Sequence, residues 1–458
     1  MRRRISLAVA LLLAAAPATA QHKEATPYDR AIAAGYKALT LCSGIFNAGR
    51  TQAGIEAIEL RGIYPEYDAI VPTLAATVDR QLATVTVAFD TAVPPRRAVW
   101  STDMGCSIEP IGAVAPPVVT SYRTSPAPAA ANPRAWPTGD AGGTAKAPPR
   151  LLPAIARAFD STSFGQGSET TAVLVIRDGK IVAERYREGF GPYVSQRTWS
   201  VAKSLAGTLV GTAVARLGVD VAKPALIPEW EGEWSFNLRR RITLDNLLRM
   251  ASGLHSDTAG NRTDAVYFGG TSVNEETTGW PVEAPPGTRF RYANNDILLA
   301  VRSLRAALGD KDYADLPRAA LFDKLGMAHT VAETDWRGNY ILSSQVWSTA
   351  RDLARFGMLY LNDGVWNGER ILPQGWVKYV TTPSGPQPEG AFGYGATFWL
   401  INNSPGVPAD AFAAFGNRGQ YVVIVPSRDI VIVRRGEDPA GARFDIAKFT
   451  ADILAALK

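Results

Sequence analysis

The sequence predicts an α/β chain of the α+β type, in which an antiparallel sheet flanked by helices stands beside a mainly helical lobe. Three observations support this: a hairpin pattern over residues 171–186 with Asp178-Gly179 at its turn, a second hairpin pattern over 422–433, and an amphipathic helix pattern over 445–457. Although the two hairpins lie far apart in the chain, we expect early and late strands to meet in one antiparallel sheet. The helices between them are expected to form the second lobe, with a site in the cleft.

A small N-terminal α/β extension precedes this sheet. Residues 29–41 have a helix-like pattern, and residues 81–89 alternate as a strand does. No catalytic constellation is found there, and residues 21–123 are assigned to an accessory domain. Residues 124–150 are rich in Pro, Ala and Gly, which is typical of a linker or of a strap laid over the next domain. The main domain is then expected over residues 151–458.

The first 20 residues have the pattern of a cleavable signal peptide. Three arginines precede an apolar run over residues 5–16, and Ala18-Thr19-Ala20 is an A-x-A cleavage site. The sequence therefore predicts a cut after Ala20 and a periplasmic or secreted protein. The alternative is an N-terminal membrane anchor, but the apolar run is too short to span a bilayer, so no stable anchor is expected after cleavage.

Composition excludes some partners and allows a large core. The net charge of +5 includes the three signal arginines, and the near balance that remains gives no reason to expect nucleic acid or an acidic membrane surface. With 46% hydrophobic residues the chain can bury a sizeable core. No partner protein is implied.

Cys42 and Cys106 are the two cysteines of the chain. In an oxidising compartment two thiols in one small region most simply form a disulfide. The alternative is a pair of reduced, buried cysteines.

Ser200-Val201-Ala202-Lys203 lies between a strand-like segment and the apolar, helix-forming run 204–217. If Ser200 opens that helix, Lys203 projects from the same face one turn deeper. A lysine whose pKa is lowered by burial can take the proton of a serine hydroxyl and make it a nucleophile. The alternative interpretation is a helix N-cap followed by a solvated lysine.

Tyr292-Ala293-Asn294 follows a turn-forming segment much later in the chain. The tyrosine offers a second proton-transfer group, and the asparagine offers an amide that can orient a bound acyl group. The alternative interpretation is an ordinary strand-to-helix junction in which Asn294 caps the helix.

Several other chemistries lack their signatures. No G-x-S-x-G nucleophile elbow is present, and the three histidines are His22, His255 and His329. The sequence has no H-E-x-x-H, no C-x-x-C, no P-loop and no Gly-rich dinucleotide fingerprint. We therefore expect neither a metal nor a cofactor.

Six sequence blocks resemble the class C-like branch of the serine β-lactamase and DD-peptidase superfamily, which includes esterases, D-aminopeptidases and 6-aminohexanoate-dimer hydrolases. The blocks occur in the order of that family, at residues 199–204, 242–248, 250–254, 286–294, 348–357 and 366–373. The resemblance implies a β-lactamase/transpeptidase-like fold and a serine hydrolase in which Ser200 is the nucleophile, with Lys203 and Tyr292 as proton-transfer groups.

The sequence departs from the family pattern at the family's third motif. Where β-lactamases carry K-T-G, the matching residues here are identified as Asn417-Arg418-Gly419, followed by Gln420. Asn417 replaces a lysine that would bind a substrate carboxylate, Arg418 is a candidate for a replacement cation, and Gly419 would allow close backbone approach. By resemblance, the N–H groups of Ser200 and Gln420 would form the oxyanion hole.

The sequence thus predicts a hydrolase that cleaves a small-molecule ester or amide through an acyl-enzyme, with Asn294 positioning the acyl group. Whether Lys203 or Tyr292 is the primary base stays open. A β-lactamase or DD-peptidase is one alternative, which the loss of the lysine disfavours. A non-catalytic binding or sensor module is the other.

A loop after residue 254 is a further candidate for substrate contact. It carries Asp257, Asp264 and Tyr267, and in the family a loop of this kind overhangs the site. His255, which precedes it, is expected to make a structural hydrogen bond.

Overall fold

The computed structural model of the chain describes four stretches, residues 25–114, 131–232, 237–256 and 263–458. The predicted signal segment with its cut after Ala20 lies outside these stretches, and so does Asp257. Within them, no helix combines the length and the apolar character that a membrane span requires.

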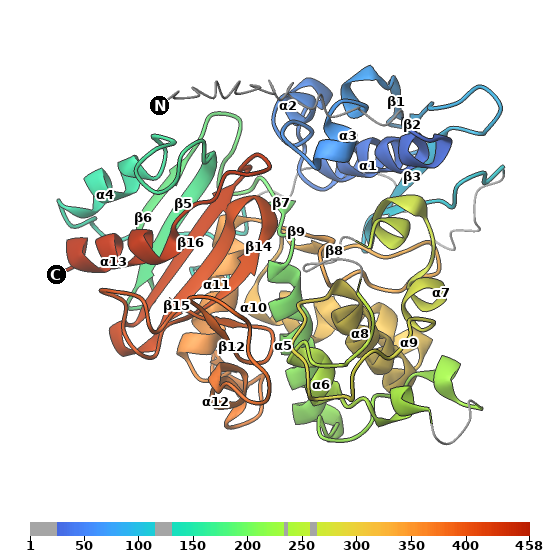
Figure 1. Cartoon of the computed structure of the whole chain (residues 1–458). Helices are drawn as coiled ribbons and strands as arrows, with labels where there is room; N and C mark the ends of the chain where they lie inside the picture. The colour runs from blue at the N-terminus through green and yellow to red at the C-terminus, as the bar shows by residue number, and fades with distance from the viewer. Residues whose placement is uncertain (1–24, 115–130, 233–236, 257–262) are drawn as a thin grey trace, which may run out of the picture.

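The main sheet is antiparallel and has the order β12-β13-β14-β15-β16-β5-β6 (Figure 1). Its strands are β12 (Gly393–Tyr394), β13 (Trp399–Leu400), β14 (Phe412–Gly416), β15 (Gln420–Val425), β16 (Ile430–Gly436), β5 (Thr170–Arg177) and β6 (Lys180–Tyr186). Because β16 pairs with β5, early and late strands meet in one sheet, and both predicted hairpins are confirmed. Asp178 and Gly179 have positive φ values of 50° and 71°, as a tight hairpin turn requires.

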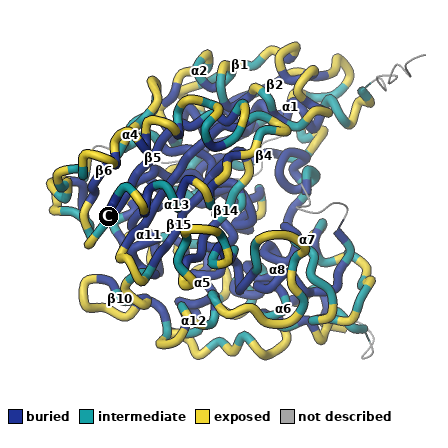
Figure 2. The backbone as a smooth tube through the Cα atoms, turned by 60° about the vertical axis from the view of Figure 1, so that its left-hand side comes forward, coloured by how far each residue is buried: buried dark blue, intermediate teal, exposed yellow. Residues whose placement is uncertain are grey.

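Both faces of this sheet are buried because alternate residues pack against different helices. In β16, Val431 and Val433 face the core that includes α5 (Val201–Leu217) and α11 (Ala350–Leu361). Ile430 and Ile432 face the opposite core, which includes α4 (Leu151–Arg157) and α13 (Ile446–Ala456). The strands are therefore dark in Figure 2 and read as continuous apolar runs.

The remaining helices and short strands mostly build the second lobe, and α5 lies between that lobe and the sheet (Figure 1). The helices are α6 (Leu244–Leu248), α7 (Val273–Thr277), α8 (Asn294–Leu308), α9 (Asp310–Ala314), α10 (Asp323–Leu325) and α12 (Trp376–Thr381). The strands are β7 (Gln196–Arg197), β8 (Val331–Ala332), β9 (Val346–Ser348), β10 (Val365–Trp366) and β11 (Glu369–Arg370).

The N-terminal region packs a long helix on a small antiparallel sheet of order β1-β2-β3-β4. Its elements are α1 (Pro27–Phe46), α2 (Gln52–Ala57), α3 (Pro65–Asp68), β1 (Ala76–Asp79), β2 (Thr84–Val87), β3 (Arg96–Ser101) and β4 (Gly105–Ile108). Cys42 and Cys106 form the expected disulfide, which ties α1 to β4. The apolar core of this region continues into Trp199, Tyr267 and Phe268 of the main domain.

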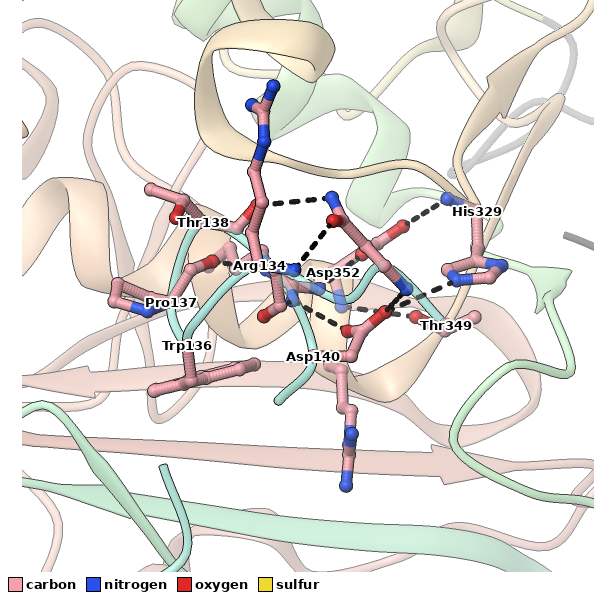
Figure 3. A network of polar contacts seen from close by, with 12 residues as sticks. Arg134, Trp136, Pro137, Thr138, Asp140, His329, Thr349 and Asp352 are labelled. Carbon is pink, nitrogen blue, oxygen red and sulfur yellow. Dashed lines mark hydrogen bonds and ion pairs between the residues drawn. The ribbon is translucent and has the colours of Figure 1, made fainter. Parts of the chain in front are cut away.

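Residues 131–150, the described part of the predicted linker, lie against the main domain. Arg355 of α11 donates to the carbonyl oxygens of Pro137 at 2.7 Å and Gly139 at 2.6 Å. It also pairs with the carboxylates of Asp140 and Asp352, each at 2.7 Å. Figure 3 shows this network, in which His329 also takes part. A buried, carboxylate-paired arginine thus fastens the strap to α11.

Candidate active site

Ser200 stands directly before α5, where Trp199 turns the chain. Trp199 has a φ of 50°, which is rare for a bulky side chain. The Ser200 hydroxyl makes no capping hydrogen bond to the helix. Instead, its Oγ lies 2.8 Å from Nζ of Lys203, and Lys203 is only 1% exposed. The alternative of a helix cap followed by a solvated lysine is therefore wrong.

Lys203 is surrounded by neutral oxygen atoms. Besides the Ser200 hydroxyl, Nζ contacts Oδ1 of Asn294 at 2.6 Å and the carbonyl oxygen of Ser343 at 2.8 Å. Among the described residues, no carboxylate lies within ion-pair distance of it. Burial lowers the pKa of Lys203 well below 10.5, and the nearby charge of Arg197 lowers it further. Neither Ser343 nor Arg197 belongs to a motif that the sequence had singled out.

Tyr292 reaches the same point from the segment that leads into α8. Its hydroxyl is hydrogen-bonded to Ser200, and its ring centroid lies 5.0 Å from Nζ of Lys203. Burial raises the pKa of Tyr292 above its ordinary value of 10, although the hydrogen bond with Ser200 opposes this. Burial thus favours the protonated form of this phenol and the unprotonated form of the Lys203 amine.

Asn294 is the first residue of α8 and does not cap it, because the capping position belongs to the preceding alanine. Tyr267, on the π-helix η4 (Ala265–Gly269), is hydrogen-bonded to Asn294 and lies 2.6 Å from Oγ of Ser343. Burial raises the pKa of Tyr267 to about 12. Tyr267 thus contacts Asn294 and Ser343, the two residues besides Ser200 whose oxygen atoms surround Lys203.

The glycine beside the start of α5 is Gly416, whereas the sequence had singled out Gly419 for close backbone approach. A Cβ on Gly416 would lie 2.4 Å from the carbonyl oxygen of Thr198 and 3.2 Å from the backbone nitrogen of Ser200. A Cβ on Gly419 would instead meet Arg434. Sequence alone did not distinguish two glycines three residues apart.

Arg418 does not present a cation to the site, so the expectation of a replacement cation is wrong. It is 7% exposed and donates to the carbonyl oxygens of Ile58 at 3.3 Å, Glu59 at 2.5 Å and Arg61 at 2.7 Å. It also pairs with Glu437 at 3.2 Å. The guanidinium is therefore bonded to the N-terminal region and to the residue that follows β16.

Asn417 and Gln420 lie at the two ends of the turn η6 (Asn417–Gly419). Asn417 is exposed, and its Oδ1 accepts from the backbone N–H of Arg418 at 2.9 Å. Gln420 is buried, and its side chain donates to the carbonyl of Gly436 and accepts from Nε of Arg435 at 2.6 Å. Of these two residues, Asn417 directly follows the glycine that touches Ser200.

Three partly exposed aromatic rings contact one another in a row that begins at Tyr292, the residue hydrogen-bonded to Ser200. Tyr292 packs against Trp399 with 5.4 Å between ring centroids, and Trp399 stacks on Phe415 at 5.6 Å. By contrast, Trp199 is buried against Tyr64 of the N-terminal domain. An apolar wall therefore lines one side of the site.

The remaining candidates have structural contacts. His255 is hydrogen-bonded to Glu283, as expected, and Asp264 accepts from the hydroxyl of Tyr67 at 2.6 Å. His329 lies 3.8 Å from Asp140, in the strap network. Among the described residues, no group of three His, Cys, Asp or Glu side chains is arranged to hold a metal ion.

The chain from residue 155 onward is similar to known proteins. The profile of the Beta-lactamase family matches residues 155–456. A 6-aminohexanoate-dimer hydrolase from Paenarthrobacter ureafaciens is 29% identical over 314 residues, covering 59% of this chain and 73% of that protein.

Two solved structures have a similar fold. A Bacillus anthracis protein assigned as a 6-aminohexanoate-dimer hydrolase aligns with a TM-score of 0.55 at 22% identity, covering 66% of this chain and 81% of its own. A class C β-lactamase variant aligns with a TM-score of 0.50 at 15% identity, covering 67% of this chain and 96% of its own. The β-lactamase/transpeptidase-like fold expected from the sequence is confirmed.

Proposed function

The chain belongs to the β-lactamase family, and we propose that it cleaves an ester or amide bond through an acyl-enzyme on Ser200. In this proposal Lys203 is the base and Tyr292 is the proton donor. It is a serine hydrolase of the β-lactamase fold, similar to a 6-aminohexanoate-dimer hydrolase. The observation that carries the proposal is the 2.8 Å contact between Ser200 Oγ and a lysine nitrogen that is buried without a carboxylate partner among the described residues.

The surroundings of Lys203 favour it over Tyr292 as the primary base. A neutral amine has two N–H bonds and one lone pair. Asn294 and Ser343 supply two good acceptors for the N–H bonds, at 2.6 and 2.8 Å, which leaves the lone pair for the hydroxyl of Ser200. The pKa of Tyr292 is raised by burial, so this phenol is better suited to donate a proton than to take one.

Each step then balances. Lys203 takes the proton of Ser200 while Oγ attacks the substrate carbonyl. As the bond from the carbonyl carbon to the leaving oxygen or nitrogen breaks, Tyr292 gives its proton to that atom and takes the proton held by Lys203, so both groups end neutral. In the second half, water attacks the acyl-enzyme and gives a proton to the base, and Ser200 leaves with its proton restored.

The second oxyanion donor is better assigned to Asn417 than to Gln420. The carbonyl oxygen that becomes negative must lie within hydrogen-bond distance of the Ser200 N–H. Gly416 lies beside that N–H, since a Cβ on it would be 3.2 Å from the Ser200 nitrogen and 2.4 Å from the carbonyl oxygen of Thr198. The N–H of Asn417 follows Gly416 directly, so we propose that Asn417 contributes through its backbone rather than its amide.

The substrate is proposed to be an uncharged ester or a linear amide. Arg418, the candidate carboxylate-binding cation, is buried and bonded elsewhere, whereas Tyr292, Trp399 and Phe415 offer apolar surface. This combination supports cleavage of short esters or amide oligomers over penicillins. A panel of substrates distinguishes this proposal from two alternatives, a β-lactamase or DD-peptidase and a non-catalytic binding module.

The test is a side-by-side panel of p-nitrophenyl esters, a linear 6-aminohexanoate dimer, a D-amino-acid amide and a cephalosporin, together with covalent labelling by a fluorophosphonate probe. We expect turnover of an ester or the linear amide, and loss of both labelling and turnover in Ser200→Ala. Ser204→Ala is the matched control, because its hydroxyl bonds to the carbonyl of Thr397 at 2.6 Å and not to the site. Preferred turnover of the cephalosporin would favour the β-lactamase, and no labelling of the wild type would favour the binding module.

Export through the predicted signal segment is proposed as well. The disulfide between Cys42 and Cys106 is consistent with an oxidising compartment. N-terminal sequencing of protein recovered from the periplasm or the medium should begin at Gln21; retention of Met1 would contradict export by cleavage.

A further inference from the structure

We propose that the N-terminal domain holds the catalytic donors in position, with Arg418 as the positioning residue that ties the turn 417–419 to the loop 58–64. The inference rests on the proposed function, because it concerns the geometry around Ser200 and the N–H of Asn417. It assigns a role in the reaction to a domain that carries no catalytic side chain of its own.

Two residues with left-handed backbone flank the proposed donors. Trp199, with a φ of 50°, directly precedes Ser200, and Arg418, with a φ of 53°, directly follows Asn417. Such conformations cost roughly 1–3 kcal/mol each for residues other than glycine, and they persist only where the surroundings impose them. Something must therefore hold both turns.

The loop 58–64 contacts both turns. At one end, the guanidinium of Arg418 donates to the carbonyl oxygens of Ile58, Glu59 and Arg61. At the other end, the ring of Tyr64 packs edge-on against Trp199, with 6.2 Å between centroids.

The loop is itself fixed on both sides. Glu59 pairs with Arg50 at 2.8 Å within the N-terminal domain. Gly62 accepts from the backbone N–H of Ala440 at 2.8 Å, and a Cβ on Gly62 would lie 2.5 Å from the side chain of Pro439. The loop is thus a rigid support between the two turns rather than a pendant segment.

Loss of this support is expected to act on the chemical step. Without the bonds from Arg418, the turn 417–419 can relax toward ordinary backbone angles and move the N–H of Asn417 away from the oxyanion. Loss of one oxyanion donor costs about 100- to 1,000-fold in kcat, and a small displacement costs less. We therefore expect kcat to fall with KM nearly unchanged.

The experiment compares the full-length wild type with Arg418→Met and Arg418→Lys. The rate of Ser200 labelling by a fluorophosphonate and the kcat and KM for a p-nitrophenyl ester are measured. Arg418→Met should slow labelling and lower kcat by about 10- to 100-fold. Arg418→Lys, which can still donate to one or two carbonyls, should recover part of this loss.

Arg355→Met is the matched control. Arg355 is also a buried arginine that donates to carbonyl oxygens of another segment, those of Pro137 and Gly139, but that segment is the strap. The Arg355→Met variant should be less stable than the wild type, without a comparable loss in the rate of Ser200 labelling. Unchanged labelling of folded Arg418→Met, or an equal loss in Arg355→Met, would overturn the inference.

A second variant decides the question if Arg418→Met does not fold. Tyr64→Leu removes the ring against Trp199 and leaves the bonds of Arg418 in place, so a smaller drop in labelling rate, with KM held, is expected. Wild-type labelling in this variant would then refute the role of the loop. If the wild-type protein itself is not labelled, that result contradicts the proposed function and not the contact between Arg418 and the loop 58–64.

Discussion

Lys203 in α5 and Arg355 in α11 are both 1% exposed, but their surroundings differ. Nζ of Lys203 contacts three neutral oxygens, whereas Arg355 pairs with the carboxylates of Asp140 and Asp352. A buried cation without a counter-charge is stabilised by losing its proton, and a buried cation between two carboxylates is stabilised by keeping it. The first arrangement suits a base, and the second suits a structural tie.

Glu333 repeats the arrangement of Lys203 with the opposite sign. It lies between the two domains and accepts from the hydroxyl of Ser43 at 2.6 Å, the amide of Asn47 at 2.8 Å and the backbone N–H of Cys106 at 3.1 Å. Burial raises its pKa to about 7. Burial therefore favours the uncharged form of this acid as it does that of the buried base, although the hydrogen bonds from Ser43, Asn47 and Cys106 oppose it.

The sharpest test of the comparison is Lys203→Met against Arg355→Met. The first keeps the apolar stem and removes the base, so kcat/KM for a p-nitrophenyl ester should fall by about 10⁴-fold or more, because base and nucleophile act as a unit. The second should keep kcat/KM within a few-fold of the wild type. Similar losses of kcat/KM in the two variants would show that Lys203 and Arg355 do not differ in the way proposed, as a catalytic base and a structural residue.

Tyr292→Phe should come next in size. Removing the proton donor is expected to lower kcat by about 100- to 10,000-fold, as is typical of general acid–base groups. The variant keeps the ring against Trp199, so its unfolding midpoint in urea should stay close to that of the wild type. A p-nitrophenolate leaving group needs little protonation, so the loss should be greater for an amide than for the ester.

Arg355→Met should destabilise the fold. Its loss leaves Asp140 and Asp352 without their shared partner, and breaking a buried ion pair costs about 3–5 kcal/mol. Urea unfolding followed by tryptophan fluorescence measures this free energy. An unchanged free energy of unfolding would mean that the strap contributes nothing to stability.

Glu333→Gln should change how stability depends on pH. The folded state holds a proton on Glu333 up to about pH 7, whereas the unfolded chain loses it near 4.5. The contribution of this group is therefore fully present below pH 4.5 and is lost as pH rises through 7. At about 1.4 kcal/mol per pH unit, the difference approaches roughly 3 kcal/mol.

The glutamine variant cannot ionise, so it should gain stability over the wild type at pH 8 and not at pH 4.5. Free energies of unfolding in urea at the two pH values measure the change. Equal pH dependence in both proteins would show that Glu333 is ionised in the folded state.

The smallest expected effect is the change of kcat/KM with pH. Lys203 must be neutral, so kcat/KM should fall about tenfold per pH unit below its lowered pKa. Because burial raises the pKa of Tyr292 above 10, ionisation of this phenol should cause no alkaline loss below pH 10. An acid limb centred at the ordinary lysine value of 10.5 would contradict the proposed base.

Much of the site could be predicted because its members are close in sequence or belong to recurrent local patterns. Ser200 and Lys203 are three residues apart, and a helix brings such residues to one face. The hairpins followed from alternating apolar residues and from Asp178-Gly179.

The sequence did not predict contacts between segments that lie far apart in the chain. Ser343 contributes its carbonyl oxygen to Lys203 from 140 residues away, and no pattern marks it. Gly416 and Gly419 both permit close approach, but only the packing of β14 against the start of α5 distinguishes them. Arg418 looked available because sequence does not record the carbonyl oxygens of the loop 58–64.

By itself the sequence determined the strands, the main helices, the disulfide pair and the three side chains expected to do the chemistry, since helix and strand periodicities and short motifs are local properties. Only the tertiary structure decided which neutral oxygens surround Lys203, which glycine lies beside the start of α5, and which carbonyl oxygens of the N-terminal region accept from Arg418. These depend on burial and on contacts between distant segments, because a pKa and a backbone strain are set by what packs around a residue and not by its neighbours in the chain.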